Sequence, residues 1–435
     1  MPPDVAHPET PPPTPTPNAQ SSPVHWPFLT RDVAALPAAI KRRYEDFEVD
    51  ELPLYEPCGE GEHVYVHFEK AGLATMRAVN DLARALGLPR HAIGVAGLKD
   101  ARAVARQTVS IERVDPDRVR ALDIPRIRIL SVTRHRNKLR IGHLRGNRFR
   151  IKLRETDLDR VVDVRRVMDT LAQRGVPNYF GSQRFGGRGD TWQIGQALLD
   201  DDFETAVELI AGRPGPSDTG AVLRARQLFG QGRYDDAARA WPYGFREPQR
   251  VCRVMAKTHG NARRAILSLE RRMLEFYVSA WQSWLFNEVL SERVDELDRV
   301  ANGDLAFKHD NGAVFRVESA EIEQPRADRF EISATGPLFG HRMTRPGGNA
   351  DHIEQGVIQR HGRATDDLPR TGLFRCNGGR RALRFRPEEP LVDVGGDDAG
   401  PFIELQFTLP AGCYATSVLR EICKDRMEEG LLEEE

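Results

Sequence analysis

Hydrophobic and polar residues alternate with a period of two in several parts of this chain, a pattern typical of half-buried β-strands. Strands are predicted on this basis over residues 63–68, 138–144, 148–154, 381–386 and 402–409. In the second and third of these segments, the residues expected to face a core are Leu139, Ile141, Phe149, Ile151 and Leu153. Those expected to face outward are Arg140, Arg148, Arg150, Lys152 and Arg154. The intervening Arg145-Gly-Asn predicts a hairpin turn.

Other segments repeat their apolar residues at helical spacing. One helix is predicted over residues 75–86 and should stop at Gly87, and a second is predicted over residues 157–173, before Gly175. Further helices are predicted near residues 261–293 and over 417–427. The aromatic stripe of the 261–293 segment is interpreted as core, since such stripes are more often buried than used to bind nucleic acid.

The order of these elements predicts the fold class. Strand patterns come first, mostly helical patterns follow, and strands return near the end. This order favours an α+β fold in which a mixed, largely antiparallel sheet domain is interrupted by a mainly helical insertion. The domain limits expected from it are 28–175 and 370–427 for the sheet domain, 176–369 for the insertion, 1–27 for a disordered proline-rich extension and 428–435 for an acidic tail.

Composition restricts the class of protein further. The chain has 435 residues and a net charge of −1, and no run approaches the roughly 18 apolar residues of a membrane span. The first 27 residues contain ten prolines and no Lys or Arg, which is unlike a signal or transit peptide. Five scattered cysteines without a Cys-x-x-Cys pair suit a reducing compartment. We therefore expect a cytoplasmic protein without membrane attachment.

The near-neutral total charge hides a strongly basic segment. Residues 126–154 contain eleven Lys or Arg and no Asp or Glu. A basic face of this kind favours a polyanionic partner, usually nucleic acid, bound partly by counterion release. It is equally compatible with a solvated sheet face whose acidic partners come from elsewhere in the chain.

Residues 93–111 carry the most informative chemistry. Two short apolar runs enclose Gly97, which permits a tight turn, and Asp100, which follows Lys99. The residues after Asp100 predict the start of a helical turn, whose dipole, together with Lys99, would keep the carboxylate ionised. An ionised carboxylate here can act as a nucleophile or stabilise a cation, but spacing alone favours an ordinary helix cap.

Several common kinds of active site are absent from the sequence. His63 and His67 lack the Glu of a His-Glu-x-x-His zinc motif, and no Cys/His cluster has zinc spacing. The glycines near residue 186 form neither a phosphate-binding loop nor a dinucleotide fingerprint. We therefore expect no metal and no cofactor, which leaves carboxylate, basic and aromatic side chains for any catalysis.

Seven motifs follow one another in order between about residues 45 and 422. They are Glu45-Asp-Phe-Glu-Val-Asp-Glu, Gly61-Glu-His, Ala96-Gly-Leu-Lys-Asp with Gln107, Arg145-Gly-Asn-Arg-Phe-Arg-Ile, Val176-Pro-Asn-Tyr-Phe-Gly-Ser-Gln-Arg-Phe-Gly, Gly336-Pro-Leu-Phe-Gly and Leu409-Pro-Ala-Gly-Cys-Tyr-Ala-Thr-Ser-Val-Leu-Arg-Glu. Together they resemble the TruD-type pseudouridine synthases. The Asn-Tyr-Phe-Gly-x-Gln-Arg-Phe-Gly motif is the most specific of them.

The resemblance implies that the sheet domain is catalytic and that residues 176–369 are the TruD insertion domain. It implies isomerisation of a tRNA uridine to pseudouridine, at position 13 in bacterial relatives, by a monomer without cofactor. By the same resemblance Asp100 is the nucleophile, Phe149 stacks on the target base, and Asn147 and Lys99 orient the site. Arg184 either binds phosphate or braces the junction of the two domains, and we count it among the substrate-binding candidates.

A second function remains open from the sequence. A non-catalytic RNA-binding or RNA-folding protein would keep the same fold and basic face. The intact Asp100 argues against it, because RNA binding alone has no use for a carboxylate that faces phosphates.

Overall fold

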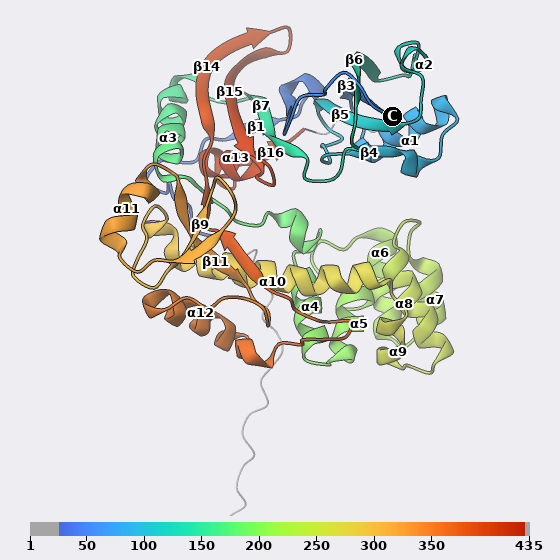
Figure 1. Ribbon diagram of the computed structural model, residues 1–435. Helices are drawn as coiled ribbons and strands as arrows, with labels where there is room; N and C mark the ends of the chain where they lie inside the picture. The colour runs from blue at the N-terminus through green and yellow to red at the C-terminus, as the bar shows by residue number, and fades with distance from the viewer. Residues whose placement is uncertain (1–25, 431–435) are drawn as a thin grey trace, which may run out of the picture.

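A ten-stranded sheet forms the upper part of the molecule in Figure 1, and its strands come from both ends of the chain. The structure, a computed structural model, describes residues 26–430. The main strand order is β14-β15-β7-β2-β5-β3-β6, and β1, β4 and β16 attach to it. The strands are β1 (Ala38–Ile40), β2 (Phe47–Pro53), β3 (His63–Ala71), β4 (Ile93–Val95), β5 (Val104–Glu112), β6 (Ile127–His135), β7 (Leu144–Arg154), β14 (Glu388–Asp397), β15 (Gly400–Pro410) and β16 (Met427–Glu429).

Strand β7 joins the two halves of this sheet. It pairs with β15 from Phe402 opposite Arg154 to Pro410 opposite Gly146, and with β2 along its other edge. The pairs β2–β5 and β1–β16 are parallel, whereas the other pairs of the sheet are antiparallel. The predicted α+β fold with a mixed, largely antiparallel sheet is confirmed.

Four helices accompany the sheet. They are α1 (Thr75–Leu86), α2 (Pro116–Arg120), α3 (Val161–Arg174) and α13 (Ala415–Cys423). Helix α1 has the predicted bounds and ends at Gly87, whose φ of 68° lies in the left-handed region that glycine adopts without strain. Its apolar stripe packs on Val64, Val66 and Phe68 of β3. Helix α3 packs against β14 on the other half of the sheet.

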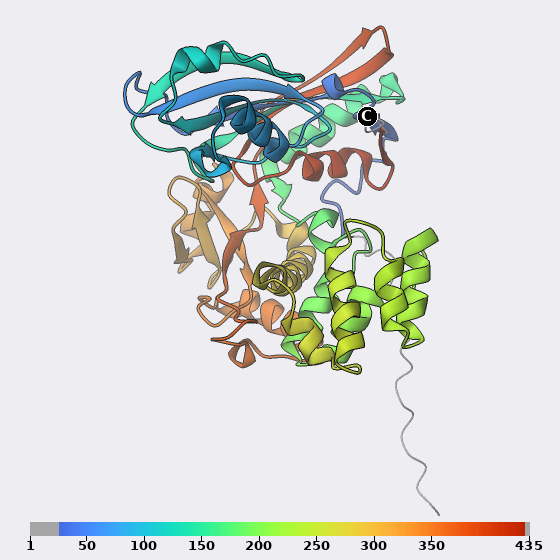
Figure 2. The same ribbon diagram turned by 90° about the vertical axis from the view of Figure 1, so that its right-hand side faces the viewer.

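The lower part of the molecule, seen from a second side in Figure 2, is mainly helical but contains a small sheet. Its helices are α4 (Thr191–Leu199), α5 (Phe203–Ala211), α6 (Gly220–Gly230), α7 (Tyr234–Ala240), α8 (Arg246–Lys257), α9 (Ala262–Leu267), α10 (Arg271–Arg293), α11 (Ala320–Asp328) and α12 (Gly348–Arg360). The small sheet has the order β10-β9-β11-β12, with β9 (Leu305–Lys308), β10 (Val314–Arg316), β11 (Ile332–Leu338) and β12 (Gly379–Ala382).

Two short strands connect the parts. Strand β8 (Val176–Pro177) leaves the sheet domain and pairs with β13 (Arg384–Phe385), which returns to it. The predicted domain limits remain a prediction. Residues 1–25 of the predicted extension and 431–435 of the predicted tail lie outside the described residues.

The prediction of a hairpin at residues 145–147 is wrong. These residues lie inside β7, and residues 138–143 form a loop instead of a strand. Within that loop Leu139 is buried as predicted, and its N–H donates to Ser110 Oγ at 2.9 Å. Gly142 (φ 94°) donates its N–H to the Ala96 carbonyl at 2.9 Å, so the loop closes on the segment before Asp100. Ile141, predicted to face the core, is exposed because this loop carries it outward.

The long helix predicted near residues 261–293 is interrupted. Helix α9 ends at Leu267 and α10 begins at Arg271. The aromatic stripe of α10 is core, as interpreted, since Tyr277, Trp281 and Leu285 are buried. Helix α10 passes through the middle of the lower part in Figure 1 and supports the small sheet through β11.

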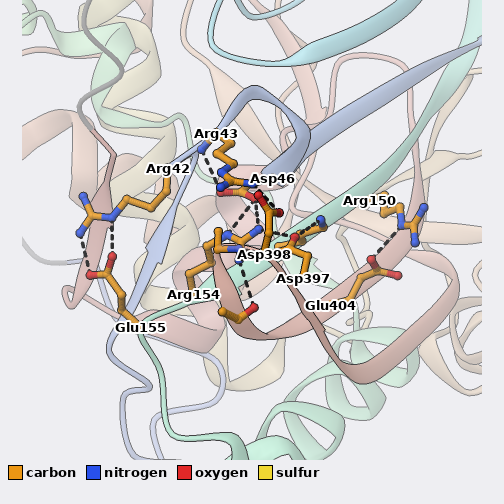
Figure 3. A network of polar contacts seen from close by, with 12 residues as sticks. Arg42, Arg43, Asp46, Arg150, Arg154, Glu155, Asp397, Asp398 and Glu404 are labelled. Atoms are coloured by element: carbon orange, nitrogen blue, oxygen red, sulfur yellow. Dashed lines mark hydrogen bonds and ion pairs between the residues drawn. The ribbon is translucent and has the colours of Figure 1, made fainter.

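Arg154, predicted to face outward, is buried instead, and Figure 3 shows its contacts with Asp46 and Asp397. Its guanidinium donates to Asp46 at 2.7 and 2.9 Å and to Asp397 at 2.7 and 3.0 Å. The hydrogen bonds from Arg154 and Lys152 hold the pKa of Asp397 well below its usual range. This network ties β7 to the segment before β2 and to the end of β14, so part of the basic segment 126–154 has acidic partners within the chain.

The first described residues connect both parts of the molecule. The Trp26 ring stacks on Tyr179 with centroids 5.9 Å apart and meets Trp284 of α10 edge-on at 5.0 Å. Four residues later, the Thr30 N–H and hydroxyl donate to the Glu421 carboxylate of α13 at 3.0 and 2.8 Å. This segment therefore contacts the insertion and the sheet domain within five residues.

We expect Arg154→Leu to lower the free energy of unfolding by about 3–5 kcal/mol, because it leaves the buried Asp46 carboxylate without its guanidinium. The matched control is Arg150→Leu on the same strand, whose side chain is 53% exposed and pairs with Glu404 at 2.8 Å. That exposed pair should contribute about 0–1 kcal/mol. Urea unfolding followed by circular dichroism measures both values, and equal losses would contradict a special role for the buried network.

Candidate active site around Asp100

Asp100 lies in the loop between β4 and β5. The predicted helical turn after it is wrong, because the chain enters strand β5 at Val104. The helix dipole expected from that turn is therefore missing. Instead Asp100 Oδ1 accepts the N–H of Arg102 at 3.2 Å, in the same loop.

Lys41, at the end of β1, supplies the charge that faces Asp100. Its Nζ is 2.6 Å from Asp100 Oδ2, and the Lys41 side chain is 4% exposed while that of Asp100 is 39% exposed. Burial raises the pKa of Asp100, but the hydrogen bond and charge of Lys41 and the N–H groups of Arg102 and Ala101 outweigh it and lower the pKa below its ordinary value. The carboxylate is therefore ionised at neutral pH and partly accessible.

A second lysine fixes the backbone of Asp100. Lys70 of β3 is completely buried, and its Nζ donates to the carbonyls of Leu73 at 2.5 Å and Asp100 at 2.7 Å. Burial lowers the pKa of Lys70 to about 8, so it remains mostly protonated at neutral pH. Its two contacts hold the Asp100 loop against the turn that precedes α1.

Lys99 does not form an ion pair with Asp100. Its Nζ binds Glu51 Oε2 at 2.5 Å, and both side chains are buried. The backbone of Lys99 is held separately, since its N–H donates to Thr75 Oγ1 at 2.7 Å and that hydroxyl also bonds Gln107 Oε1 at 3.0 Å. The expectation that Lys99 keeps Asp100 ionised is corrected, because the ammonium that contacts this carboxylate is Lys41.

Asn147 lies beside the Lys99–Glu51 pair. It is directly opposite Glu51 in the β2–β7 register and opposite Leu409 in the β7–β15 register. Its Oδ1 is buried and has no hydrogen-bond partner within residues 26–430. An acceptor left open in this way is available for a donor group of a bound molecule.

Phe149 is connected to Asp100 through two intermediate side chains. Lys41 Nζ lies 4.7 Å from the centre of the Phe47 ring, and the Phe47 and Phe149 rings are 6.1 Å apart at a steep angle. Phe149 also packs on Phe407, with centroids 5.6 Å apart. Its side chain is buried, at 7% exposure, so only a small part of the ring is accessible.

Arg184 has different surroundings. It lies in a short 3-10 turn (Ser182–Phe185), and its guanidinium donates to the hydroxyls of Ser279 and Ser283 on α10. It forms no hydrogen bond or ion pair with the other four predicted site residues. The structure thus gathers Asp100, Lys99, Asn147 and Phe149 around β2, β5 and β7, and places Arg184 where the insertion begins.

The surface around these residues is basic and partly apolar. Arg140, Arg145 and Arg148 are exposed, and in the part of the chain that the structure describes none of them pairs with a carboxylate. Leu98, two residues before Asp100, is also exposed. The interpretation as a sheet face with acidic partners elsewhere in the chain holds for Arg128, Arg136, Lys138, Arg150, Lys152 and Arg154, which pair with carboxylates. The interpretation as a surface for a polyanion stays a prediction for Arg140, Arg145 and Arg148.

Comparison with known proteins identifies the family. The model of the tRNA pseudouridine synthase D (TruD) family matches residues 26–422. The chain belongs to the TruD family. It is 45% identical to tRNA pseudouridine synthase D of Geobacter sulfurreducens, over 91% of this chain and 96% of that protein. It is 37% identical to the protein of that name from Anaeromyxobacter dehalogenans, over 92% and 96%.

A solved structure shows the same fold. The crystal structure of a protein from Methanosarcina mazei assigned as tRNA pseudouridine synthase D superposes with a TM-score of 0.81, at 27% identity, over 91% of this chain and 95% of that one. Family and fold together make this TruD-family protein an isomerase of the tRNA pseudouridine synthase class. The sequence-based assignment to this family is confirmed.

The described residues contain no sign of a membrane span or a metal site. None of the helices between residues 26 and 430 combines the length and apolarity that a bilayer span requires. No group of three or more His, Cys, Asp or Glu side chains in that range is arranged to hold a metal ion. All five cysteines are free thiols.

Three residues of this site were not predicted from the sequence, although the sequence pattern pointed to two of them. Lys70 occupies an inward position of an alternating strand, in phase with Val64, Val66 and Phe68, so a buried charge was foreseeable. Glu51 is the last residue of the motif that begins at Glu45. Lys41 had no comparable signal, because its contact with Asp100 depends on how β1 is placed in the sheet.

We expect Lys41→Met to shift the acidic limb of the pH–rate profile to higher pH. The present pKa of Asp100 is lowered, so activity should persist until the pH falls through that lowered value; without Lys41, burial raises the pKa and activity is lost earlier on acidification. The matched control is Arg42→Met, whose side chain pairs with Glu155. Pseudouridine formation measured from pH 4.5 to 8.5 tests this, and superimposable profiles would contradict it.

Proposed function

We propose that this TruD-family protein converts uridine 13 of tRNA to pseudouridine with Asp100 as the nucleophile. The observation that carries the proposal is the Lys41–Asp100 pair, which keeps an ionised carboxylate partly exposed within a basic surface. The family supports the reaction class, and the position in the tRNA is taken from the resemblance to bacterial relatives. On this proposal the enzyme acts in the cytoplasm as a monomer.

The reaction suits a site built from a carboxylate and held lysines. Pseudouridine formation breaks the N1–C1′ bond and joins C5 to C1′. The C5 proton is lost and N1 gains a proton, so the nucleotide keeps the same atoms. Asp100 would either attack C1′ or remove the C2′ proton to give a glycal. Both routes need the ionised carboxylate, and neither needs an oxidant, a metal or an external energy source.

The remaining predicted residues fit supporting roles in this proposal. Asn147 would donate to or accept from the uracil or ribose through the amide whose oxygen is open. Lys99, neutralised by Glu51, would hold the Asp100 loop rather than contact the substrate. The accessible edge of Phe149 would contact the target base once that base has left the RNA stack. Unstacking the base costs a few kcal/mol. Stacking on an aromatic ring returns about 1–3 kcal/mol when the whole face is available.

The decisive experiment replaces the carboxylate alone. We expect Asp100→Asn to lower the rate of pseudouridine formation on unmodified tRNA by at least about 1,000-fold, since the amide lacks the nucleophilic charge. Asp123→Asn is the matched control, because Asp123 is an exposed carboxylate of the same domain without an ion pair within the described residues. Carbodiimide mapping locates the product, and a transcript with cytidine at position 13 tests the site of modification.

Binding and catalysis are separable in this test. The affinity of Asp100→Asn for tRNA should stay within about threefold of the wild type, because the phosphate contacts that dominate affinity are unchanged. A wild-type protein that binds tRNA but never forms pseudouridine would favour the non-catalytic RNA-binding alternative. A fully active Asp100→Asn variant would remove the mechanism but leave the activity.

A second pair of variants tests Phe149. Phe149→Leu and Phe407→Leu each shorten a buried ring of the same cluster and should destabilise the fold by a similar amount, about 1 kcal/mol. If Phe149 contacts the base, Phe149→Leu alone should lower kcat/KM by about tenfold. Steady-state kinetics and thermal unfolding of both variants measure this, and parallel losses in the two would assign Phe149 to the core.

A further inference from the structure

Two arginines at the junction of the insertion and the sheet domain share one aromatic partner. Arg184 follows β8, and Arg381 lies in β12. The two guanidinium carbons are 5.8 and 4.4 Å from the centre of the Phe180 ring. Arg184 also lies over Phe276, and Arg381 over Phe286. Both guanidinium groups therefore contact the same ring, and the charge of Arg184 acts on Arg381.

The polar partners of both arginines are neutral. Arg184 donates to the hydroxyls of Ser279 and Ser283, and Arg381 donates to the side-chain oxygen of Asn178. Within residues 26–430 neither guanidinium forms an ion pair with a carboxylate, and the buried Nε of Arg381 has no hydrogen-bond partner at all. Burial lowers the pKa of Arg381, and the charge of Arg184 lowers it further.

Three buried arginines of the described chain have a carboxylate partner. Arg293 pairs with Asp304, Arg380 with Glu354, and Arg154 with Asp46. Arg384 has no direct carboxylate, but its three donor groups reach Ser333 and the carbonyls of Arg174 and Ala327. A desolvated charge without a counter-ion is costly, and the fold avoids that cost at Arg293, Arg380 and Arg154. The Arg184–Arg381 pair lacks an anion.

Arg184 and Arg381 are each half-buried, and backbone contacts connect their surroundings to the active site. Gly181, Ser182 and Gln183 beside Arg184 are exposed, as is Tyr414. The segment that leads to Tyr414 starts at β15, where Leu409 is opposite Asn147 and the Ala411 N–H donates to the Arg145 carbonyl at 3.1 Å. Cys413 and Tyr414 lie close to Arg381, so this segment lies between the Asn147 end of β7 and the arginine pair.

We propose that Arg184 and Arg381 together bind one backbone phosphate of the RNA. The inference rests on the proposed function, because only an RNA substrate brings phosphates to this junction. A phosphate would supply the missing negative charge, and guanidinium groups match its geometry with two parallel hydrogen bonds. Bound there, it would connect the insertion to the sheet domain through the substrate and fix the position of the strand that enters the active site.

The test measures tRNA binding in the Asp100→Asn background, where no turnover occurs. We expect Arg184→Gln and Arg381→Gln each to weaken tRNA binding by about tenfold, and the slope of log Kd against log salt to fall by about one when both are replaced. Arg272→Gln, an exposed arginine of α10 without an ion pair in the described chain, controls for the loss of surface charge and should change the Kd by less than about threefold.

A purely structural role predicts a different result. If the pair only braces the junction, the double variant should have a lower melting temperature and an unchanged salt slope, which would overturn the proposal. The variant with lysine at both positions keeps both charges and is a control for misfolding of the double Gln variant. It should have the salt slope of the wild type but only part of its affinity, because lysine lacks the paired donors. A wild type that forms no pseudouridine would overturn the proposed function, whereas the salt slope on the same tRNA still decides the phosphate site.

Discussion

The pairing of β7 with β15 is the constraint on which the rest of this molecule depends. It joins residues 146–154 to residues 402–410, with the whole insertion between them in sequence. Because a strand in the interior of a sheet must satisfy its backbone groups on both edges, β7 also pairs with β2, and β2 with β5. Those contacts bring the Asp100 loop, which precedes β5, to the same region as Asn147 and Phe149 of β7.

Three lysines stabilise the candidate site in three different ways. Lys41 faces the Asp100 carboxylate, Lys70 binds the carbonyl of the same residue, and Lys99 is neutralised by Glu51. Only the first pair leaves its carboxylate partly exposed. The Asp100 carboxylate is thus held in place by groups that are themselves fixed by burial. Little reorganisation of the site is therefore required when a substrate binds.

Some basic side chains of this protein are neutralised by acidic residues of the chain, whereas others would be neutralised by a ligand. Along β7, Arg150, Lys152 and Arg154 meet acidic residues of β14, β15 and the segment before β2. At the other end of the same strand, Arg145 and Arg148 have no such partner within the described chain, and the same holds for Arg184 and Arg381 at the junction. The unpaired cations lie toward the end of β7 that carries Asn147, which is consistent with an RNA that approaches from this side.

Period-two and helical patterns were sufficient to predict the strands 63–68 and 402–409, helix 75–86 and the interruption of a sheet domain by helices, because burial of one face is a local property of the sequence. The motifs, which match the family from residue 26 to 422, pointed to Asp100. Local patterns failed where a distant partner decides the outcome. Arg154 alternates like an outward residue but is buried by Asp46 and Asp397, and Arg145-Gly-Asn resembles a turn but is drawn into β7 by pairing with β2 and β15. The counter-ion of Asp100 likewise belongs to tertiary structure alone, since only the placement of β1 in the sheet brings Lys41 to a residue 59 positions away.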